Sequence, residues 1–164
     1  KHMESTPKNE IWNYQQVCLG FNYRMTEIQA ALGLSQLNKL DSFITRRHQI
    51  ASIYNEELSN LPIIIPWQQP ENYSSYHLYP IQIREDAPLN RRELYENLIN
   101  SGIGVNVHYI PIHLQPYYKR LGFNRGDFPT SESYYSKTIS LPIYYGLLEE
   151  EQTKVIDLLN KFLQ

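Results

Sequence analysis

The fold is decided by the stretch LGFNYRMTEIQAALG, residues 19–33, in which a compact polar turn leads directly into a helix. Thr26 and Gln29 fit a capping box, where each side chain satisfies a backbone N–H at the helix start. The spacing therefore predicts a helix that begins near Thr26, with Asn22 and Arg24 in the turn before it. A turn set between a glycine and a capped helix is a rigid place to carry site residues.

Composition limits the classes of protein that this chain can represent. Its 164 residues are 41% hydrophobic, which suits one buried core and one compact domain. A net charge of −2 leaves no basic surface for nucleic acid or an anionic membrane. The sequence has no run of about 18 apolar residues that would predict a membrane-spanning helix. It also has no apolar segment near Lys1 that would predict a secretory signal. The single cysteine, Cys18, suits a reducing compartment, so we expect a cytoplasmic protein.

Hydrophobic spacing predicts an α+β fold. Apolar residues from Thr26 to about Asn60 recur every three or four positions, which predicts one long helix with a bend near Asp41. Short strands are expected at 61–66, 76–83, 103–109 and 140–143, and further helices at 90–100, 117–121, 131–139 and 148–163. In the third of these helices Ser131 is the expected N-cap. This order predicts a small, mostly antiparallel sheet covered by helices.

Spacing alone points only weakly to chemistry. His77, His108 and His113 are expected around the sheet, but a zinc site needs a further ligand and a spacing that these residues do not offer, so we predict no metal site. The glycines form neither a Walker loop nor a dinucleotide fingerprint. His108 and Tyr109 end a predicted strand, where sites commonly form, although an ordinary strand end would have the same pattern.

Several motifs together resemble one family. They are residues 20–33, Gln36-Leu37, Leu40-Asp41, Tyr76-His77-Leu78, residues 102–113, Phe128-Pro129 and Ser140-Leu141-Pro142. In the same order they are similar to the C-terminal region of DegT-type sugar aminotransferases, which use pyridoxal phosphate. Residues 105–118 are most similar to members of the pseudaminic acid pathway, which aminate C4 of a UDP-linked 4-keto-6-deoxy-N-acetylhexosamine.

The resemblance implies how the chain is organised. Residues 1–25 would be an irregular arm carrying the site turn, and residues 26–164 the C-terminal small domain of a fold-type-I aminotransferase. In such enzymes a lysine holds the cofactor aldehyde as a Schiff base. None of the lysines here stands in the family's lysine context. We therefore expect a fragment that is inactive alone, without its large domain.

The same resemblance implies roles for five residues. Family members are similar to homodimers with sites between subunits, so Asn22 would reach the cofactor phosphate held by the partner, and Arg24 would hold the turn or bind phosphate. His108 and Tyr109, and less strongly His113, would contact the UDP-sugar. Glutamate is the expected amino donor.

Two other functions stay open at this stage. The chain could be a non-catalytic module for binding sugar nucleotides or for dimerisation. It could also belong to the relatives that replace the lysine by histidine and dehydrate the sugar.

Overall fold

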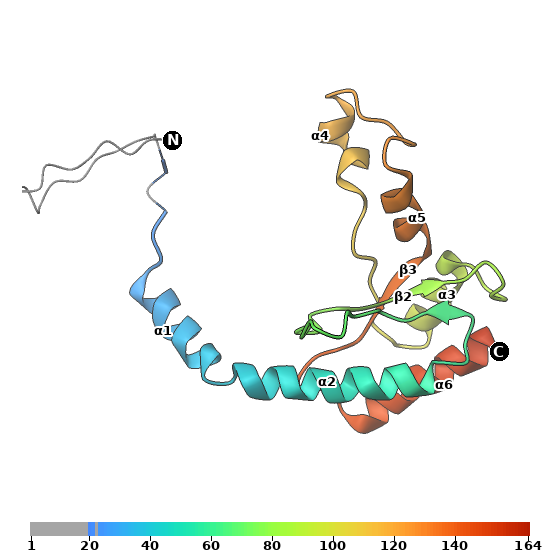
Figure 1. Ribbon diagram of the computed structural model, residues 1–164, viewed down its shortest axis with the longest axis horizontal. Coiled ribbons are helices and arrows are strands. Elements are labelled where there is room, and N and C mark those ends of the chain that lie inside the picture. The colour runs from blue at the N-terminus through green and yellow to red at the C-terminus, as the bar shows by residue number, and fades with distance from the viewer. Residues whose placement is uncertain (1–19, 22) are drawn as a thin grey trace, which may run out of the picture. The chain divides into compact units, whose positions relative to one another are not determined.

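The computed structural model describes residues 20, 21 and 23–164 (Figure 1). Backbone contacts divide the chain into two compact units, residues 1–38 and 39–164. In chain order, the described elements are α1 (Glu27–Leu37), α2 (Leu40–Glu57), β1 (Ile63–Ile64), β2 (Tyr79–Ile83), α3 (Arg91–Asn100), the 3-10 turn η1 (Ile112–Leu114), α4 (Pro116–Lys119), α5 (Pro129–Lys137), β3 (Thr138–Leu141) and α6 (Glu149–Leu163).

The first unit contains the capped helix that the sequence predicts. The Thr26 backbone N–H donates to Gln29 Oε1 at 2.9 Å, and the Gln29 N–H donates to Thr26 Oγ1 at 3.3 Å, so the capping box is confirmed. The predicted long helix is divided in two, because α1 ends at Leu37 and α2 begins at Leu40, close to the bend expected near Asp41. Neither glycine nor proline stands between them, so no residue type marks the break in the sequence.

The second unit is built on a three-stranded antiparallel sheet in the order β1-β2-β3. Tyr79 and Ile81 of β2 lie opposite Leu141 and Ile139 of β3, and all four side chains are buried. Because side chains alternate along a strand, these four point to one face and Ser140 to the other. The fold is α+β with a small antiparallel sheet packed by helices, as predicted.

Helices α2, α3 and α6 supply much of the rest of the core. Figure 1 shows α2 and α6 running alongside each other, and Gln152 of α6 donates from Nε2 to the Ile50 carbonyl of α2 at 2.9 Å. Two tyrosines reach the core with their hydroxyls paired: Tyr54 donates to Pro142 O at 3.0 Å and Tyr79 to Asn55 Oδ1 at 2.6 Å. Burial raises the pKa of both hydroxyls, so they remain donors at neutral pH.

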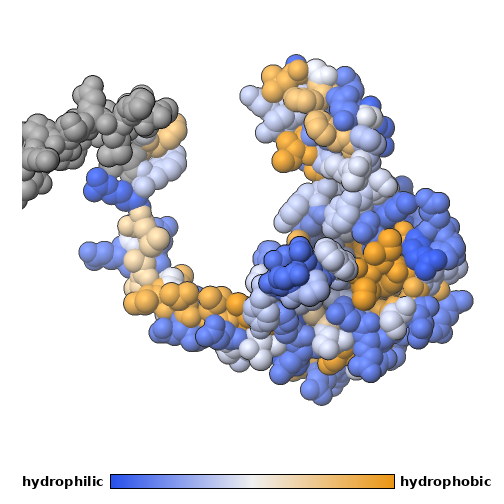
Figure 2. Space-filling model, in the orientation of Figure 1, coloured by the Kyte–Doolittle hydropathy of each residue, from blue (hydrophilic) through white to orange (hydrophobic). Residues whose placement is uncertain are grey.

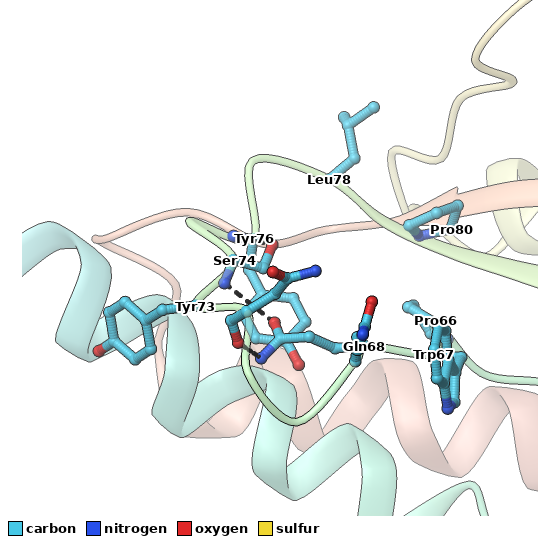
Figure 3. A pocket seen from close by; sticks show the side chains of 10 residues that line it. Pro66, Trp67, Gln68, Tyr73, Ser74, Tyr76, Leu78 and Pro80 are labelled. Atoms are coloured by element: carbon cyan, nitrogen blue, oxygen red, sulfur yellow. Dashed lines mark hydrogen bonds between the residues drawn. The ribbon is translucent and has the colours of Figure 1, made fainter.

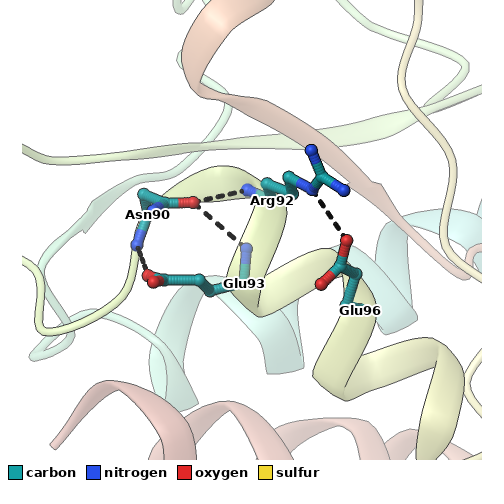
Figure 4. Close-up of polar contacts among 4 residues, drawn as sticks. All are labelled: Asn90, Arg92, Glu93 and Glu96. Carbon is teal, nitrogen blue, oxygen red and sulfur yellow. Dashed lines mark hydrogen bonds and ion pairs between the residues drawn. The ribbon is translucent and has the colours of Figure 1, made fainter.

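Helix α3 begins at a second capping box (Figure 4). Asn90 Oδ1 accepts from the backbone N–H groups of Arg92 and Glu93, and the Glu93 carboxylate accepts from the Asn90 N–H at 2.9 Å. The helix ends at Asn100 with Ser101 as its C-cap, and Gly102 follows with φ of 80°, a left-handed conformation that glycine adopts without strain. Both ends agree with the predicted helix at 90–100.

Three other predicted elements differ from the structure. The strand expected at 103–109 is mostly irregular, and within it only Asn106 forms a β-bridge, to Ser140. Ser131 is not an N-cap, because α5 begins two residues earlier at Pro129, whose fixed φ suits a first helical position. The strand expected at 140–143 lies at Thr138–Leu141 instead.

Apolar side chains also appear on the surface (Figure 2). In the first unit, Ile28, Leu32, Leu34 and Leu37 are all more than half exposed, and α1 buries no residue. Among the described residues, no helix combines the length and apolar character needed to cross a bilayer.

Candidate functional site

Residues 107–137 leave the sheet after the β-bridge at Asn106 and return to it at strand β3. We call this segment the excursion. Two backbone hydrogen bonds fix its base: the Asn106 N–H donates to Ser140 O at 3.3 Å, and the Ser140 N–H donates to Asn106 O at 2.8 Å. The Val107 N–H donates to Asn106 Oδ1 at 2.7 Å. The first residues of the excursion are therefore held against the sheet.

His108 and Tyr109 lie together directly after this bridge. His108 Nδ1 lies 2.8 Å from Ser140 Oγ, and the two aromatic rings meet edge to face with centroids 4.6 Å apart. His108 is half-buried, whereas Tyr109 is 70% exposed. No other hydrogen bond to the imidazole occurs in the described part of the chain. The pair thus presents an imidazole ring that its contact with Ser140 holds in place, and beside it an exposed tyrosine side chain.

His113 occupies a different environment further along the excursion. It is only 6% exposed, its Nε2 lies 2.8 Å from Glu132 Oε1, and its ring packs on Phe128 with centroids 4.8 Å apart. The Gly126 N–H donates to the same carboxylate oxygen at 2.7 Å. These two hydrogen bonds hold the pKa of Glu132 below its ordinary value. His113 therefore ties the two ends of the excursion together, and a role for it in substrate binding stays a prediction.

A hollow of about 320 Å³ lies beside the base of the excursion. Its lining combines two arginines, two tyrosines and three residues that flank the His108–Tyr109 pair, namely Arg91, Arg92, Tyr95, Asn106, Val107, Ile110 and Tyr135. The Arg91 guanidinium lies over the Tyr135 ring, 5.0 Å from its centroid, and Arg92 pairs with Glu96 at 2.8 Å. Aromatic and guanidinium groups of this kind can receive a flat ring or an anionic group.

A second hollow, of about 550 Å³, lies under the loop between β1 and β2 (Figure 3). Gln68 shapes this loop, since its side chain donates to Asn72 O and accepts from the Ser74 N–H. Trp67 at its rim is 81% exposed. Neither His108 nor Tyr109 lines this hollow or the first one, but the first is lined by their chain neighbours Val107 and Ile110.

The other two predicted site residues fall in the first unit. Asn22, like Cys18, lies outside the described residues. Arg24 is described and exposed, and a guanidinium is a bidentate donor suited to phosphate. Among residues 20, 21 and 23–164, no three His, Cys, Asp or Glu side chains group in a way that could hold a metal ion.

The described lysines bear on whether a pyridoxal cofactor fits. Lys137 pairs with Glu85 at 3.0 Å, Lys161 lies over the Phe162 ring, and no lysine lines the hollow beside segment 106–110. The Arg24 guanidinium therefore suits the phosphate of such a cofactor. None of the described lysines places its amine beside His108. That the lysine which holds the cofactor lies outside this chain stays a prediction.

Sequence reasoning did not identify the partners of the two histidines. Ser140 and Glu132 lie 32 and 19 residues from the histidines that they contact. Ser140 belongs to the quoted motif Ser140-Leu141-Pro142, which was the available signal. Glu132 stands near the start of α5 among polar residues and carries no such signal.

Comparisons with known proteins agree on one family. Residues 2–160 match the DegT/DnrJ/EryC1/StrS aminotransferase family. The spore coat polysaccharide biosynthesis protein SpsC of Bacillus subtilis is 37% identical over 153 residues, covering 91% of this chain and 39% of that protein. The UDP-4-amino-4,6-dideoxy-N-acetyl-beta-L-altrosamine transaminase of Campylobacter jejuni is 32% identical over 158 residues, covering 96% of this chain and 42% of that protein.

Solved structures agree with the sequence relatives. The Streptococcus pneumoniae protein Spr1654, in its PLP form, superposes with a TM-score of 0.81 at 31% identity, covering 93% of this chain and 40% of that one. The same protein has also been solved in a PMP form, so pyridoxal phosphate is a cofactor found in this family. The chain spans about two fifths of the length of these relatives. With nearly its whole length matched, the chain belongs to the DegT/DnrJ/EryC1/StrS aminotransferase family.

Proposed function

We propose that this chain is the C-terminal small domain, residues 26–164 with the arm 1–25 before it, of an aminotransferase that acts on a nucleotide sugar. The substrate that we propose is a UDP-linked 4-keto-6-deoxy-N-acetylhexosamine, aminated at C4 with glutamate as donor, in pseudaminic-acid-type surface-sugar synthesis. The observation that carries this proposal is the His108–Tyr109 pair, held at the base of the excursion in a chain of this family. The named activity of the Campylobacter relative supports the choice of a UDP-sugar.

In this proposal the chain's own residues bind and orient. His108 and Tyr109 donate hydrogen bonds to the diphosphate and sugar, which are rich in acceptor oxygens. Asn22 and Arg24 donate to the phosphate of a cofactor held by the partner subunit of a homodimer. When bound, pyridoxal phosphate supplies the electron sink and carries the amino group. His113 and Glu132 fix the excursion, which keeps His108 and Tyr109 in place. We place the enzyme in the cytoplasm.

The test uses the complete product of the gene, incubated with the UDP-4-keto sugar, glutamate and pyridoxal phosphate. Mass spectrometry should show the keto oxygen replaced by an amine, with one 2-oxoglutarate formed per sugar. Loss of water without gain of nitrogen would instead identify a sugar dehydratase. Binding of the UDP-sugar without any turnover would identify a non-catalytic module.

Two substitutions connect the activity to the pair. Tyr109→Phe and His108→Gln should each lower kcat/KM by about tenfold or more, because each removes a hydrogen bond to an anionic ligand. Tyr134→Phe is the matched control, since Tyr134 is an exposed tyrosine of α5. Equal activity in Tyr109→Phe and Tyr134→Phe would remove Tyr109 from the proposed site.

A further inference from the structure

Ser140 has an unusual position for a polar side chain. It is 4% exposed, yet it points to the face of the sheet opposite Ile139 and Leu141, which pack into the core. Its backbone is paired on both sides, with Pro80 of β2 in register on one and Asn106 on the other. In the described part of the chain, the only hydrogen bond of its hydroxyl is the 2.8 Å contact with His108 Nδ1.

This environment decides which group donates in the contact. A serine hydroxyl can either donate to Nδ1 or accept from Nδ1–H. If it accepted, its own O–H would be buried without an acceptor, and an unmade buried hydrogen bond costs about 1–3 kcal/mol. If it donates, the O–H is satisfied and Nδ1 must be unprotonated in the neutral ring. The proton of the neutral imidazole then lies on Nε2.

We infer that Ser140 is a positioning residue, which orients the His108 ring and fixes its proton on Nε2, so that His108 presents an N–H donor to an anionic ligand. The inference rests on the proposed function for the identity of that ligand, the diphosphate of a nucleotide. The tautomer matters because a neutral imidazole with its proton on Nδ1 would present the lone pair of Nε2 to the ligand. A diphosphate oxygen is itself an acceptor and could not bond to it.

The same strand provides a matched control. Thr138 is two residues before Ser140, is fully buried, and donates from Oγ1 to Tyr134 O at 2.7 Å without contacting His108. Ser140→Ala and Thr138→Val each remove one buried hydroxyl from the same face of β3. A loss of stability common to both variants can therefore be separated from an effect on His108.

The first measurement is nitrogen NMR of the histidine rings in the complete protein labelled with ¹⁵N-histidine, with His108 assigned by the His108→Gln variant. In the unsubstituted protein at neutral pH, His108 should carry its proton on Nε2 and show an unprotonated, hydrogen-bonded Nδ1. Ser140→Ala should shift Nδ1 and mix the two tautomers, whereas Thr138→Val should change neither. A His108 ring protonated on Nδ1 in the unsubstituted protein would overturn the inference without any variant.

The second measurement is calorimetric titration of the same proteins with UDP. Ser140→Ala should weaken binding by about 3- to 10-fold, the value of one ordinary hydrogen bond, with Thr138→Val within about twofold of the unsubstituted protein. Unchanged ring spectra and UDP affinity in Ser140→Ala would refute the positioning role and leave the proposed function standing. If the unsubstituted protein does not bind UDP, the proposed function fails together with the ligand assigned to His108, while the NMR result still decides the Ser140 contact.

Discussion

Helices α1 and α3 begin with the same chemistry and differ in what they bury. Thr26 pairs with Gln29 at the start of α1, and Asn90 pairs with Glu93 at the start of α3. Helix α3 then buries Leu94 and Leu98 completely, whereas α1 buries no side chain. A capping box therefore specifies where a helix begins, and it is the packing of a side-chain face that determines how firmly the helix is held.

The exposed helix is the more apolar of the two. Ile28 is 83% exposed and Leu32 62% exposed in α1. An isolated helix of 11 residues is marginal in water even when its sequence favours helix formation. The difference between α1 and α3 can be tested in three ways, and a fourth test extends it to the excursion; they follow from the largest expected effect to the smallest.

Hydrogen exchange of this chain should separate the two helices by the widest margin. We expect the amides of α3 to be protected up to the global free energy of unfolding and those of α1 to exchange through local opening. With a domain stability of at least about 5 kcal/mol, we expect exchange in α3 to be slower by about a thousandfold or more. Equal protection in the two helices would show that α1 is held as firmly as the core.

Truncating one leucine in each helix should reveal the same contrast in equilibrium stability. Leu98→Ala removes a fully buried side chain and should lower the free energy of unfolding by about 2–5 kcal/mol. Leu32→Ala is the matched change at an exposed position and should alter it by no more than about 0.5 kcal/mol. Urea denaturation followed by circular dichroism measures both. A large effect of Leu32→Ala would contradict the comparison.

Removing the capping residue of each helix should show the same contrast between α1 and α3, with a smaller change in stability than the leucine truncations. Asn90→Ala deprives two backbone N–H groups of their acceptor and should cost about 1 kcal/mol in global stability. Thr26→Ala should leave the unfolding midpoint unchanged and lower only the helical signal before the main transition. If both variants shift the midpoint equally, the two helices unfold as one unit.

The smallest effect concerns the excursion, whose apolar residues are exposed like those of α1 but whose ends are tied by Glu132. Because the folded pKa of Glu132 is lowered, its carboxylate stabilises the fold above the ordinary glutamate pKa of about 4.3, and this contribution is lost as pH falls below that value. The stability difference between the unsubstituted chain and Glu132→Gln should therefore shrink between about pH 5 and pH 3. Glu85→Gln, at an exposed ion pair with Lys137, is the control and should show little difference at any pH.

Local patterns in the sequence were sufficient to predict an element wherever interactions between near neighbours in the chain form that element. The capping residues of α1 and α3 act within three positions, so the sequence predicted where both helices begin. The expected strand at 103–109 failed for the opposite reason. Ile103 and Val105 are buried in alternation, as in a strand, but regular pairing also needs a neighbouring backbone, and β3 offers only Ser140 for pairing with Asn106.

The candidate site was predictable to a similar extent. The resemblance of their motif singled out His108 and Tyr109, which are neighbours in the chain and whose rings contact each other, and their role in binding stays a prediction. The residues that hydrogen-bond to the two histidines were not identified, because Ser140 and Glu132 lie far from them in the sequence and come close only in the folded chain. A long-range hydrogen bond has no periodic signal in the sequence, so such contacts can be read only from the folded chain.

The alternation along β3 has a consequence for how new substrate preferences could arise. Ile139 and Leu141 serve the core, while Thr138 and Ser140 face the excursion. A substitution at Ser140 changes the support of His108, while Ile139 and Leu141 continue to pack in the core. One strand of four residues thus carries a face that packs in the core and a face on which Ser140 contacts His108, so a library that varies only position 140 would change that contact and leave the core residues of β3 as they are.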